Sequence, residues 1–314
     1  TVHSSLYNKT REGFLKKLIE MAPEGLTQVH LNNSGAEAVE AAMKFARKFT
    51  GKKGMVAMKG SYHGKSFGAL SLTFNPKYRK AFAPLVEKVS FASFGDIDSL
   101  RSVIDEDTAF IILEPIQGES GIVVAPDGFL QEVRKLCDEK GILLVFDEIQ
   151  AGLGRTGRLW AGEHWNTVPD ILCLAKGIAG GVPMGATLVK PGILAAISKG
   201  EHSSTFGGNP ISCAAGIAAL TSLTEDGLIE NSKKMGEIFR EGLEKLKEKH
   251  TMIREIRGKG LMIGIEMKFE VKDILMGLID QGVLMLYSGR NILRILPPLV
   301  IKEEDVTNVV HALD

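Results

Sequence analysis

The sequence predicts an α/β protein in which a large three-layer domain is followed by a smaller α+β unit. Short apolar runs at 109–115 and 142–148 are typical of strands that are buried on both faces. The segment between them has helical spacing, and a strand–helix–strand unit with this crossover length indicates parallel strands. The alternation recurs on both sides, so we expect the three-layer region to span about residues 25–220.

The elements of this region have separate signals. A strand is expected near 54–58. The helix between the two clearest strands should end at Gly141, because glycine readily closes a helix. A strand at 170–176 is followed so closely by apolar residues at 183–190 that the two should pair antiparallel. An earlier helix presents one apolar face, made of Val39, Ala42, Met43, Ala46 and Phe49.

The C-terminal part has a different pattern. A long charged helix at 226–249 should be followed by two short strands that Gly258 and Gly260 separate. A helix at 271–281, a strand at 283–286 and a final helix should complete this α+β unit.

We therefore expect a large domain at 23–222 and a small domain at 223–314. Residues 1–22 resemble the middle of a fold, with a helical pattern and no strand before it. We expect them to be the remnant of a longer N-terminal segment that leads into the large domain.

Composition excludes several classes of partner. The chain has 314 residues, of which 44% are hydrophobic, and its 38 basic and 38 acidic residues give zero net charge. Neither nucleic acid nor an anionic membrane is favoured, and no apolar run could span a bilayer. The three cysteines lie far apart in apolar segments, which predicts free thiols in the cytoplasm, and the histidines lack the spacing of metal ligands.

Two charged residues end buried strands. Asp147 closes the run "ILLVFD", and an unpaired buried carboxylate is costly, so it should have a cationic or hydrogen-bonding partner. Lys176 ends another strand and precedes a glycine-rich loop. Loss of solvation there would lower its pKa and make the amine a nucleophile able to form a Schiff base. A lysine that extends to the surface is the alternative.

Two further segments could contact a ligand. Ser34 and Gly35 stand directly before a helix, whose first N–H groups can bind phosphate, although an ordinary cap completed by Glu37 explains the same pattern. Tyr62 lies in a small polar loop after a strand and could stack on a planar ring or simply pack in a turn.

The four features should meet, because ligands bind at the carboxyl ends of parallel strands. A phosphate-bearing cationic ring with an aldehyde would use all of them. Pyridoxal phosphate has these properties, and its protonated ring nitrogen would be the missing partner of Asp147.

The chain resembles class III (ω-amino) pyridoxal-phosphate aminotransferases of fold type I. It is most similar to the acetylornithine branch, including relatives that make lysine on an amino-group carrier protein. The resemblance spans nearly the whole chain, and its motifs occur in the family's order: "NSGAEAVEAAMKFAR", "YHGKSFGALSLT", "EPIQGESG", "FDEIQAGLGRTG", "AKGIAGGVPMGA", "STFGGNP" and "LRILPPL". It implies a mostly parallel seven-stranded sheet between helices, with a smaller C-terminal domain.

The resemblance also implies roles for particular residues. Lys176 would bind the cofactor covalently and move the reacting proton, while Asp147 keeps the ring nitrogen protonated. Arg294 would bind the α-carboxylate of glutamate or 2-oxoglutarate, and Glu119 would pair with it when an ω-amino substrate is bound. The remaining cofactor-binding positions implied are Ser34, Gly35, Ala36, Tyr62, His63, Ile149, Gln150 and Thr205.

In this family Thr205 would complete the phosphate site of a neighbouring subunit, which implies a homodimer with shared active sites. One departure concerns the substrate. Lys65 stands where acetylornithine aminotransferases commonly have arginine, so the charge that contacts the substrate carboxylate is kept but the bidentate fork is lost.

The expected reaction is transamination between glutamate/2-oxoglutarate and an N-blocked ω-amino acid, either N-acetylornithine or an acetylated or carrier-linked lysine, in arginine or lysine biosynthesis. Sister activities remain as alternatives: ornithine, 4-aminobutyrate or diaminopelargonate aminotransferase, or an aminomutase. A catalytically inactive regulatory protein of the same fold is disfavoured by the intact Lys176 and Asp147. A dinucleotide-binding dehydrogenase is disfavoured because no G-x-G-x-x-G opens a helix after a strand.

Overall fold

The computed structural model describes residues 6–314. Internal contacts divide them into two compact units. Unit 1 comprises residues up to 115 together with 125–150 and 162–222, and unit 2 comprises 116–124, 151–161 and 223–314. The domain boundaries expected from the sequence remain a prediction.

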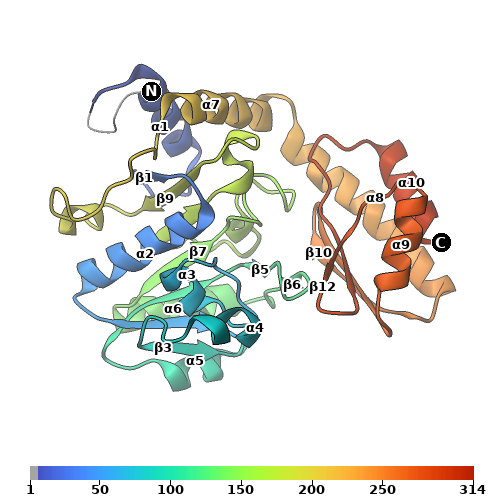
Figure 1. The fold of residues 1–314 in the computed structure, drawn as a ribbon, viewed down its shortest axis with the longest axis horizontal. Coiled ribbons are helices and arrows are strands. Elements are labelled where there is room, and N and C mark those ends of the chain that lie inside the picture. Colours follow the sequence, from blue (N-terminus) through green and yellow to red (C-terminus); the bar gives the residue numbers. More distant parts are fainter. Residues whose placement is uncertain (1–5) are drawn as a thin grey trace. The chain divides into compact units, whose positions relative to one another are not determined.

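Unit 1 contains a seven-stranded sheet, which confirms the fold predicted above (Figure 1). Neighbouring strands from β3 to β8 pair in parallel, whereas β9 is antiparallel to both β8 and β1. In spatial order the strands are β1 (Gln28–Asn32), β9 (Gly185–Val189), β8 (Ile171–Leu174), β7 (Leu143–Asp147), β4 (Thr108–Leu113), β2 (Gly54–Met58) and β3 (Val89–Ala92).

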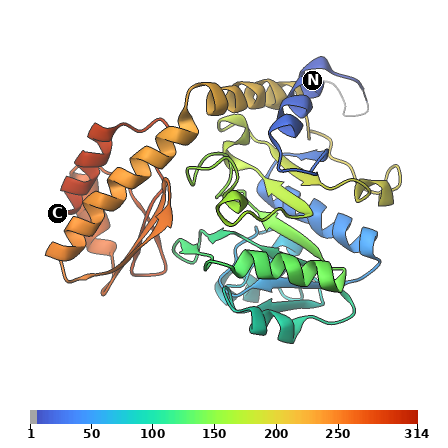
Figure 2. The same cartoon turned by 180° about the vertical axis from the view of Figure 1, so that it is seen from behind.

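Helices cover both faces of this sheet. Helix α2 lies on the face turned toward the viewer in Figure 1, and α6 lies on the face seen in Figure 2. Apolar residues of α2 pack against β4, β7, β8 and β9 in one buried core, because its inward face is apolar. Besides most of α7 (Pro210–Glu225), the α-helices of unit 1 are α1 (Lys9–Met21), α2 (Gly35–Thr50), α3 (Phe67–Leu72), α4 (Pro76–Arg79), α5 (Ile97–Val103) and α6 (Phe129–Lys140).

Helix α7 (Pro210–Glu225) leads into unit 2, which contains a four-stranded antiparallel sheet and a short hairpin. One face of the sheet is apolar and packs on α8 and α10. The sheet strands in spatial order are β10 (Ile253–Lys259), β11 (Met262–Met267), β13 (Ile292–Ile295) and β12 (Leu286–Ser288). The hairpin is β5 (Ile116–Gln117) with β6 (Val123–Val124), and the helices are α8 (Leu228–Lys249), α9 (Lys272–Asp280) and α10 (Glu303–Leu313).

Three sequence expectations need correction. The strand expected at 283–286 is β12, which begins at Leu286. Gly258 lies inside β10 and does not separate two strands, since the turn is made at Gly260. Phe49 near the end of α2 is 46% exposed and does not join the apolar face assigned to it.

No helix within residues 6–314 has both the length and the apolar character needed to cross a membrane.

The cysteines are buried and unpaired, as expected for free thiols, and burial raises the pKa of Cys137 to about 12.

Candidate active site

Asp147 has its partners within the chain. Its side chain is 4% exposed at the carboxyl end of β7, and its Oδ2 lies 2.7 Å from His63 Nδ1. Oδ1 accepts a hydrogen bond of 3.1 Å from the N–H of Ile149. A buried carboxylate with two partners avoids most of the cost of burial. The buried position of Asp147 predicted that such a partner must exist, but nothing in the sequence pattern identified His63 as that partner.

His63 is itself fixed by the loop that follows β2. Its N–H donates to Thr73 Oγ1 at 2.9 Å, and the Thr73 hydroxyl lies within hydrogen-bond distance of the Gly64 and Ala69 carbonyls. The ring is buried, and its Nε2 has no hydrogen-bond partner among the described residues. The position of Asp147 therefore depends on a rigid neighbouring loop.

The loop after β7 packs against the start of α2. A Cβ built on Gly35 would lie only 2.8 Å from Ile149 Cδ1, so the absence of a side chain at Gly35 leaves room for Ile149. Gln150, the next residue, has a buried Oε1 without a hydrogen-bond partner among the described residues. An amide in this position can exchange its oxygen and nitrogen by a flip, so a donor for an oxygen atom is available there.

Ser34 caps α2. Its hydroxyl accepts a hydrogen bond of 3.2 Å from the Glu37 N–H, while Glu37 Oε2 accepts one of 2.6 Å from the Asn33 N–H. The ordinary cap is therefore present, although Glu37 reaches one residue further back than in a standard capping box. The cap leaves the first N–H groups of the helix without intrahelical partners, which also suits an anion.

Tyr62 and Lys65 meet around one aromatic ring. Tyr62 is half-buried, its N–H donates to Glu114 at 2.9 Å, and its ring makes an edge contact with Tyr78 at 5.9 Å between centroids. Lys65 is exposed, with Nζ 5.0 Å from the centre of the Tyr78 ring. Tyr78 was not singled out by the sequence analysis, because it lies in the separate helix α4.

Lys176 stands two residues beyond the end of β8. Its backbone φ is +49°, a left-handed conformation that is uncommon for a residue with a side chain and is often found at functional sites. Its side chain is exposed in the single subunit. Of the two alternatives left open by the sequence, the single subunit shows the lysine that extends to the surface, because β8 ends at Leu174.

Thr205 is exposed in the loop before α7. The adjacent Ser204 accepts a hydrogen bond of 3.0 Å from Asn33 Nδ2, which ties this loop to the residue before the Ser34 cap. Gly207 approaches the carbonyl of Leu31 too closely for a side chain. The loop is thus held against β1 at Leu31 and against Asn33, the residue that follows β1, while Thr205 stays accessible.

In unit 2, Arg294 and Glu119 form an ion pair. Arg294 Nη1 lies 2.9 Å from Glu119 Oε1 and donates to the Gly118 carbonyl at 3.2 Å. Arg294 is buried, and its Nε has no hydrogen-bond partner among the described residues. Glu119 is 36% exposed at its side chain, so of the two it is the more easily moved.

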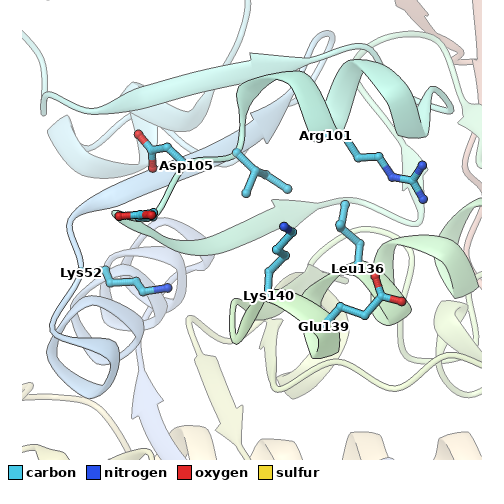
Figure 3. Close-up of a pocket in the computed structure, with 8 residues that line it drawn as sticks. Lys52, Arg101, Asp105, Leu136, Glu139 and Lys140 are labelled. Atoms are coloured by element: carbon cyan, nitrogen blue, oxygen red, sulfur yellow. The ribbon is translucent and has the colours of Figure 1, made fainter.

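A cavity of about 590 Å³ lies at the amino ends of strands of the large sheet, opposite to the ends that carry the residues described above (Figure 3). Lys52, Asp105 and Lys140, which line it, precede β2, β4 and β7, so it faces the amino ends of strands whose carboxyl ends carry His63 and Asp147. It is therefore separate from the cluster described above. No group of three potential metal ligands occurs in the part of the chain that the structure describes.

The residues gathered here suit pyridoxal phosphate. Gln150 offers a buried amide oxygen without a partner among the described residues, Ile149 packs directly against the backbone of Gly35, and Asp147 is a buried carboxylate held in place by His63. The fold and this donor set define a pyridoxal-phosphate-dependent transferase. A family model described as aminotransferase class-III matches residues 1–314, and the chain belongs to that family. It is therefore a pyridoxal-phosphate-dependent aminotransferase.

Known relatives are similar over nearly the whole chain. The acetylornithine aminotransferase of Methanopyrus kandleri is 43% identical over 309 residues, which cover 98% of this chain and 79% of the relative. The [LysW]-aminoadipate semialdehyde/glutamate semialdehyde transaminase of Sulfurisphaera tokodaii is 43% identical over 312 residues, covering 99% and 80%. The solved ornithine aminotransferase of Toxoplasma gondii superimposes with a TM-score of 0.95 at 33% identity, covering 99% and 77%.

Proposed function

We propose that this enzyme transfers an amino group between glutamate/2-oxoglutarate and an N-blocked ω-amino acid, in arginine or lysine biosynthesis. The observation that carries the proposal is the pair formed by buried Arg294 and partly exposed Glu119. Two of the relatives support the choice of substrate, since one is named an acetylornithine aminotransferase and the other a [LysW]-aminoadipate semialdehyde/glutamate semialdehyde transaminase.

The bound cofactor would supply an electron sink for the charge left when a proton leaves the amino-bearing carbon of the substrate. In this proposal Lys176 binds it covalently and then carries that proton. Asp147, aligned by His63, keeps its ring nitrogen protonated. The rest of the cradle would be formed by Ser34, Gly35 and Ala36 at the phosphate, Gln150 at the ring oxygen, and Tyr62 and Ile149 on the two ring faces.

The two substrates need opposite surroundings at Arg294. Glutamate presents its α-carboxylate there, and the guanidinium with its unpartnered Nε can bind a carboxylate at two points. An ω-amino acid enters by its terminal amine and brings no charge to Arg294. Because an unpaired buried cation is costly, Glu119 pairs with Arg294 in that state and moves away for glutamate.

Lys65 is proposed to hold the outer carboxylate of the ω-amino substrate. Its amine lies over the Tyr78 ring at the surface, beside Tyr62. An ammonium group is a point charge without the fork of a guanidinium, so this contact should select charge more than geometry.

The test compares N-acetylornithine, N-acetyllysine, ornithine and 4-aminobutyrate as amino donors to 2-oxoglutarate. An N-blocked donor should have the highest kcat/KM, and Lys65→Ala should raise its KM far more than that of a neutral ω-amine. Lys59→Ala, which removes another lysine of the same region, is the control. Preference for 4-aminobutyrate, or no response of any donor to Lys65→Ala, would contradict the proposed substrate class.

Ornithine is the second candidate substrate, because the chain superimposes closely on a solved ornithine aminotransferase. The same assay separates the two, since ornithine carries a free α-amine that the N-blocked donors lack. The N-blocked amino donor could also be attached to a small carrier protein. The name of the Sulfurisphaera tokodaii relative, which includes [LysW], supports this form of the donor.

The active unit is proposed to be a homodimer in the cytoplasm. The anchored loop that leaves Thr205 exposed supports a role for this residue in the phosphate site of a second subunit. The buried free cysteines are consistent with a reducing compartment.

A further inference from the structure

The polar face of the four-stranded sheet carries two arginines around one glycine. The strand register places Gly264 of β11 opposite Arg257 of β10 on one side and opposite Arg294 of β13 on the other. Residues directly opposite in a sheet project to the same face. The two guanidinium groups therefore flank a position that has no side chain.

A turn at 118–121 is seated over this glycine. A Cβ built on Gly264 would lie 2.8 Å from the Gly121 carbonyl oxygen, and one on Gly121 would collide with the side chain of Ile292. Gly121 also has a φ of +95°, which favours glycine. The close approach of turn and sheet thus requires both glycines.

The two arginines hold the turn from opposite sides. Arg257 Nε donates to the Gly121 carbonyl at 2.8 Å, and Arg294 Nη1 donates to the Gly118 carbonyl at 3.2 Å. The turn is closed by a hydrogen bond of 3.2 Å from the Gly121 N–H to the Gly118 carbonyl. Glu119, the partner of Arg294, lies within this turn, and its own carbonyl accepts a hydrogen bond from the Ser288 hydroxyl. The position of its carboxylate therefore depends on these contacts with the turn.

Arg257 is in turn fixed by carboxylates. Its Nη1 lies 2.7 Å from Glu255 and 2.7 Å from Glu266, and its side chain is 14% exposed. The hydrogen bond from Arg257 holds the pKa of Glu266 below its ordinary value, so Glu266 stays charged at neutral pH. Arg254 also pairs with Glu266, at 2.8 Å, but is 59% exposed at its side chain and contacts Oε1, whereas Arg257 contacts Oε2.

We propose that Arg257 is a positioning residue for substrate choice, which acts by holding the 118–121 turn so that Glu119 meets Arg294. This inference rests on the proposed exchange of Glu119 between the two half-reactions. A cavity of about 430 Å³, lined in part by Ser120, Val123 and Arg257, adjoins the network. The turn consequently has space to shift once Arg257 no longer holds it.

The first measurement is hydrogen exchange at the Gly121 and Ile122 amides, both of which donate to the Gly118 carbonyl. In Arg257→Met these amides should exchange at least about tenfold faster than in wild type, because the hold on the turn is lost. Arg254→Met is the matched control: it removes a partner of the same Glu266 and should leave both amides unchanged. If the Gly121 and Ile122 amides exchanged at the same rate in the two variants, the proposal would be wrong. This outcome does not depend on which substrate the enzyme uses.

The second measurement follows the two half-reactions separately in single turnovers. Glu119→Ala should favour the glutamate half-reaction over the ω-amine half-reaction, because Arg294 loses its partner when the ω-amine is bound. Arg257→Met should shift the ratio of the two rate constants in the same direction, by about tenfold. In the Glu119→Ala background, Arg257→Met should cause no further shift, because it acts through Glu119. A merely structural role would slow both half-reactions alike in either background, which would refute the proposal.

Arg257→Lys keeps the assay decisive should Arg257→Met not fold. It retains a cation for Glu266 but lacks the planar fork that reaches Gly121 and the carboxylates together. In Arg257→Lys the Gly121 and Ile122 amides should also exchange faster, and the ratio of the two half-reaction rates should shift in the same direction as in Arg257→Met. Wild-type values in both measurements would contradict the proposal. Wild-type enzyme that accepts no glutamate would refute the proposed function, while the exchange data would still decide the role of Arg257.

Discussion

At the scale of single residues, the site depends on buried groups with few ways to move. Asp147 accepts hydrogen bonds from a buried ring and from a backbone N–H, and the ring is held by Thr73. Such a carboxylate cannot turn away from a positive charge placed against it. This rigidity suits a group that must stabilise one charged form of a bound ring.

Replacing Asp147 with Asn should lower transamination by at least about a hundredfold, the size expected for a lost electrostatic contact with developing charge. Glu148→Gln is the matched control, because Glu148 is the adjacent buried carboxylate and binds the Gly162 N–H. It should reduce stability more than the rate constant of the loaded enzyme. Steady-state kinetics at saturating cofactor measure the turnover of both variants, and urea unfolding measures their stability. Near-normal turnover of Asp147→Asn would refute its role.

Gly35→Ala should weaken cofactor binding by at least about tenfold, or about 1.4 kcal/mol, because the new methyl group displaces Ile149. Gly277→Ala in α9 is the control, since nothing lies within 4 Å of its Cβ position. That change should stabilise the protein by about 0.5–1 kcal/mol and leave cofactor affinity unchanged. Fluorescence titration with pyridoxal phosphate gives the affinities, and equal affinity of Gly35→Ala and wild type would show that Ile149 does not line the ring.

At the scale of elements, strand ends could be predicted from the sequence but their neighbours could not. The apolar run before Asp147 predicted β7 and a buried carboxylate that needs a partner. The partner follows β2, two strands away in the sheet, and strand order cannot be read from one apolar run. Likewise, the apolar run predicted β8, but it did not predict that the strand ends two residues before Lys176, which is exposed.

The C-terminal unit gives the same lesson. The helices at 228–249 and 272–280 were predicted closely, because they have strong periodicity. Gly258 was taken for a boundary, although β10 continues through it to pair with Ile263. The sequence contains Gly121 and Gly264, but their common purpose becomes visible only when the turn lies over the sheet.

The contact of β1 with α2 and the loop at 199–208 should respond to pH. Burial, then His202 and Lys44, lower the pKa of His30 from 6.5 to about 4, while Glu37 opposes this shift. Its ring packs against Phe45 and His202, and its Nε2 lacks a partner among the described residues. Neutral His30 thus stabilises the folded state above pH 6.5, and this contribution is lost as the pH falls toward 4.

Urea unfolding at pH 7.5 and at pH 5 measures this effect. The loss of stability between the two pH values should be smaller in His30→Gln than in wild type, because glutamine does not titrate. His311→Gln removes an exposed histidine of α10 and should behave as wild type. An identical pH dependence in all three proteins would exclude His30 as the source.

At the scale of the whole molecule, the proposed role of Thr205 needs two subunits for one active site. If Thr205 serves a partner's phosphate site, a Lys176→Ala chain and a Thr205→Ala chain are defective at different positions of a shared site. Mixed dimers then contain one site with neither change. Unfolding and refolding the two inactive variants together should restore about a quarter of wild-type activity, because half of the dimers are mixed and each has one intact site.

Each variant refolded alone is the control and should remain inactive. Full activity in a fraction that elutes as a monomer would exclude the shared site.

The central claim is that this chain is an aminotransferase that accepts glutamate through a cofactor bound at Lys176. The most direct measurement is the absorbance spectrum of the purified protein with pyridoxal phosphate, before and after glutamate is added and then after N-acetylglutamate semialdehyde, the aldehyde that transamination of N-acetylornithine produces. The visible band of the covalently bound cofactor should disappear with glutamate and return with the semialdehyde, and neither change should occur in Lys176→Ala. A band that forms in wild type but does not respond to glutamate would contradict the claim.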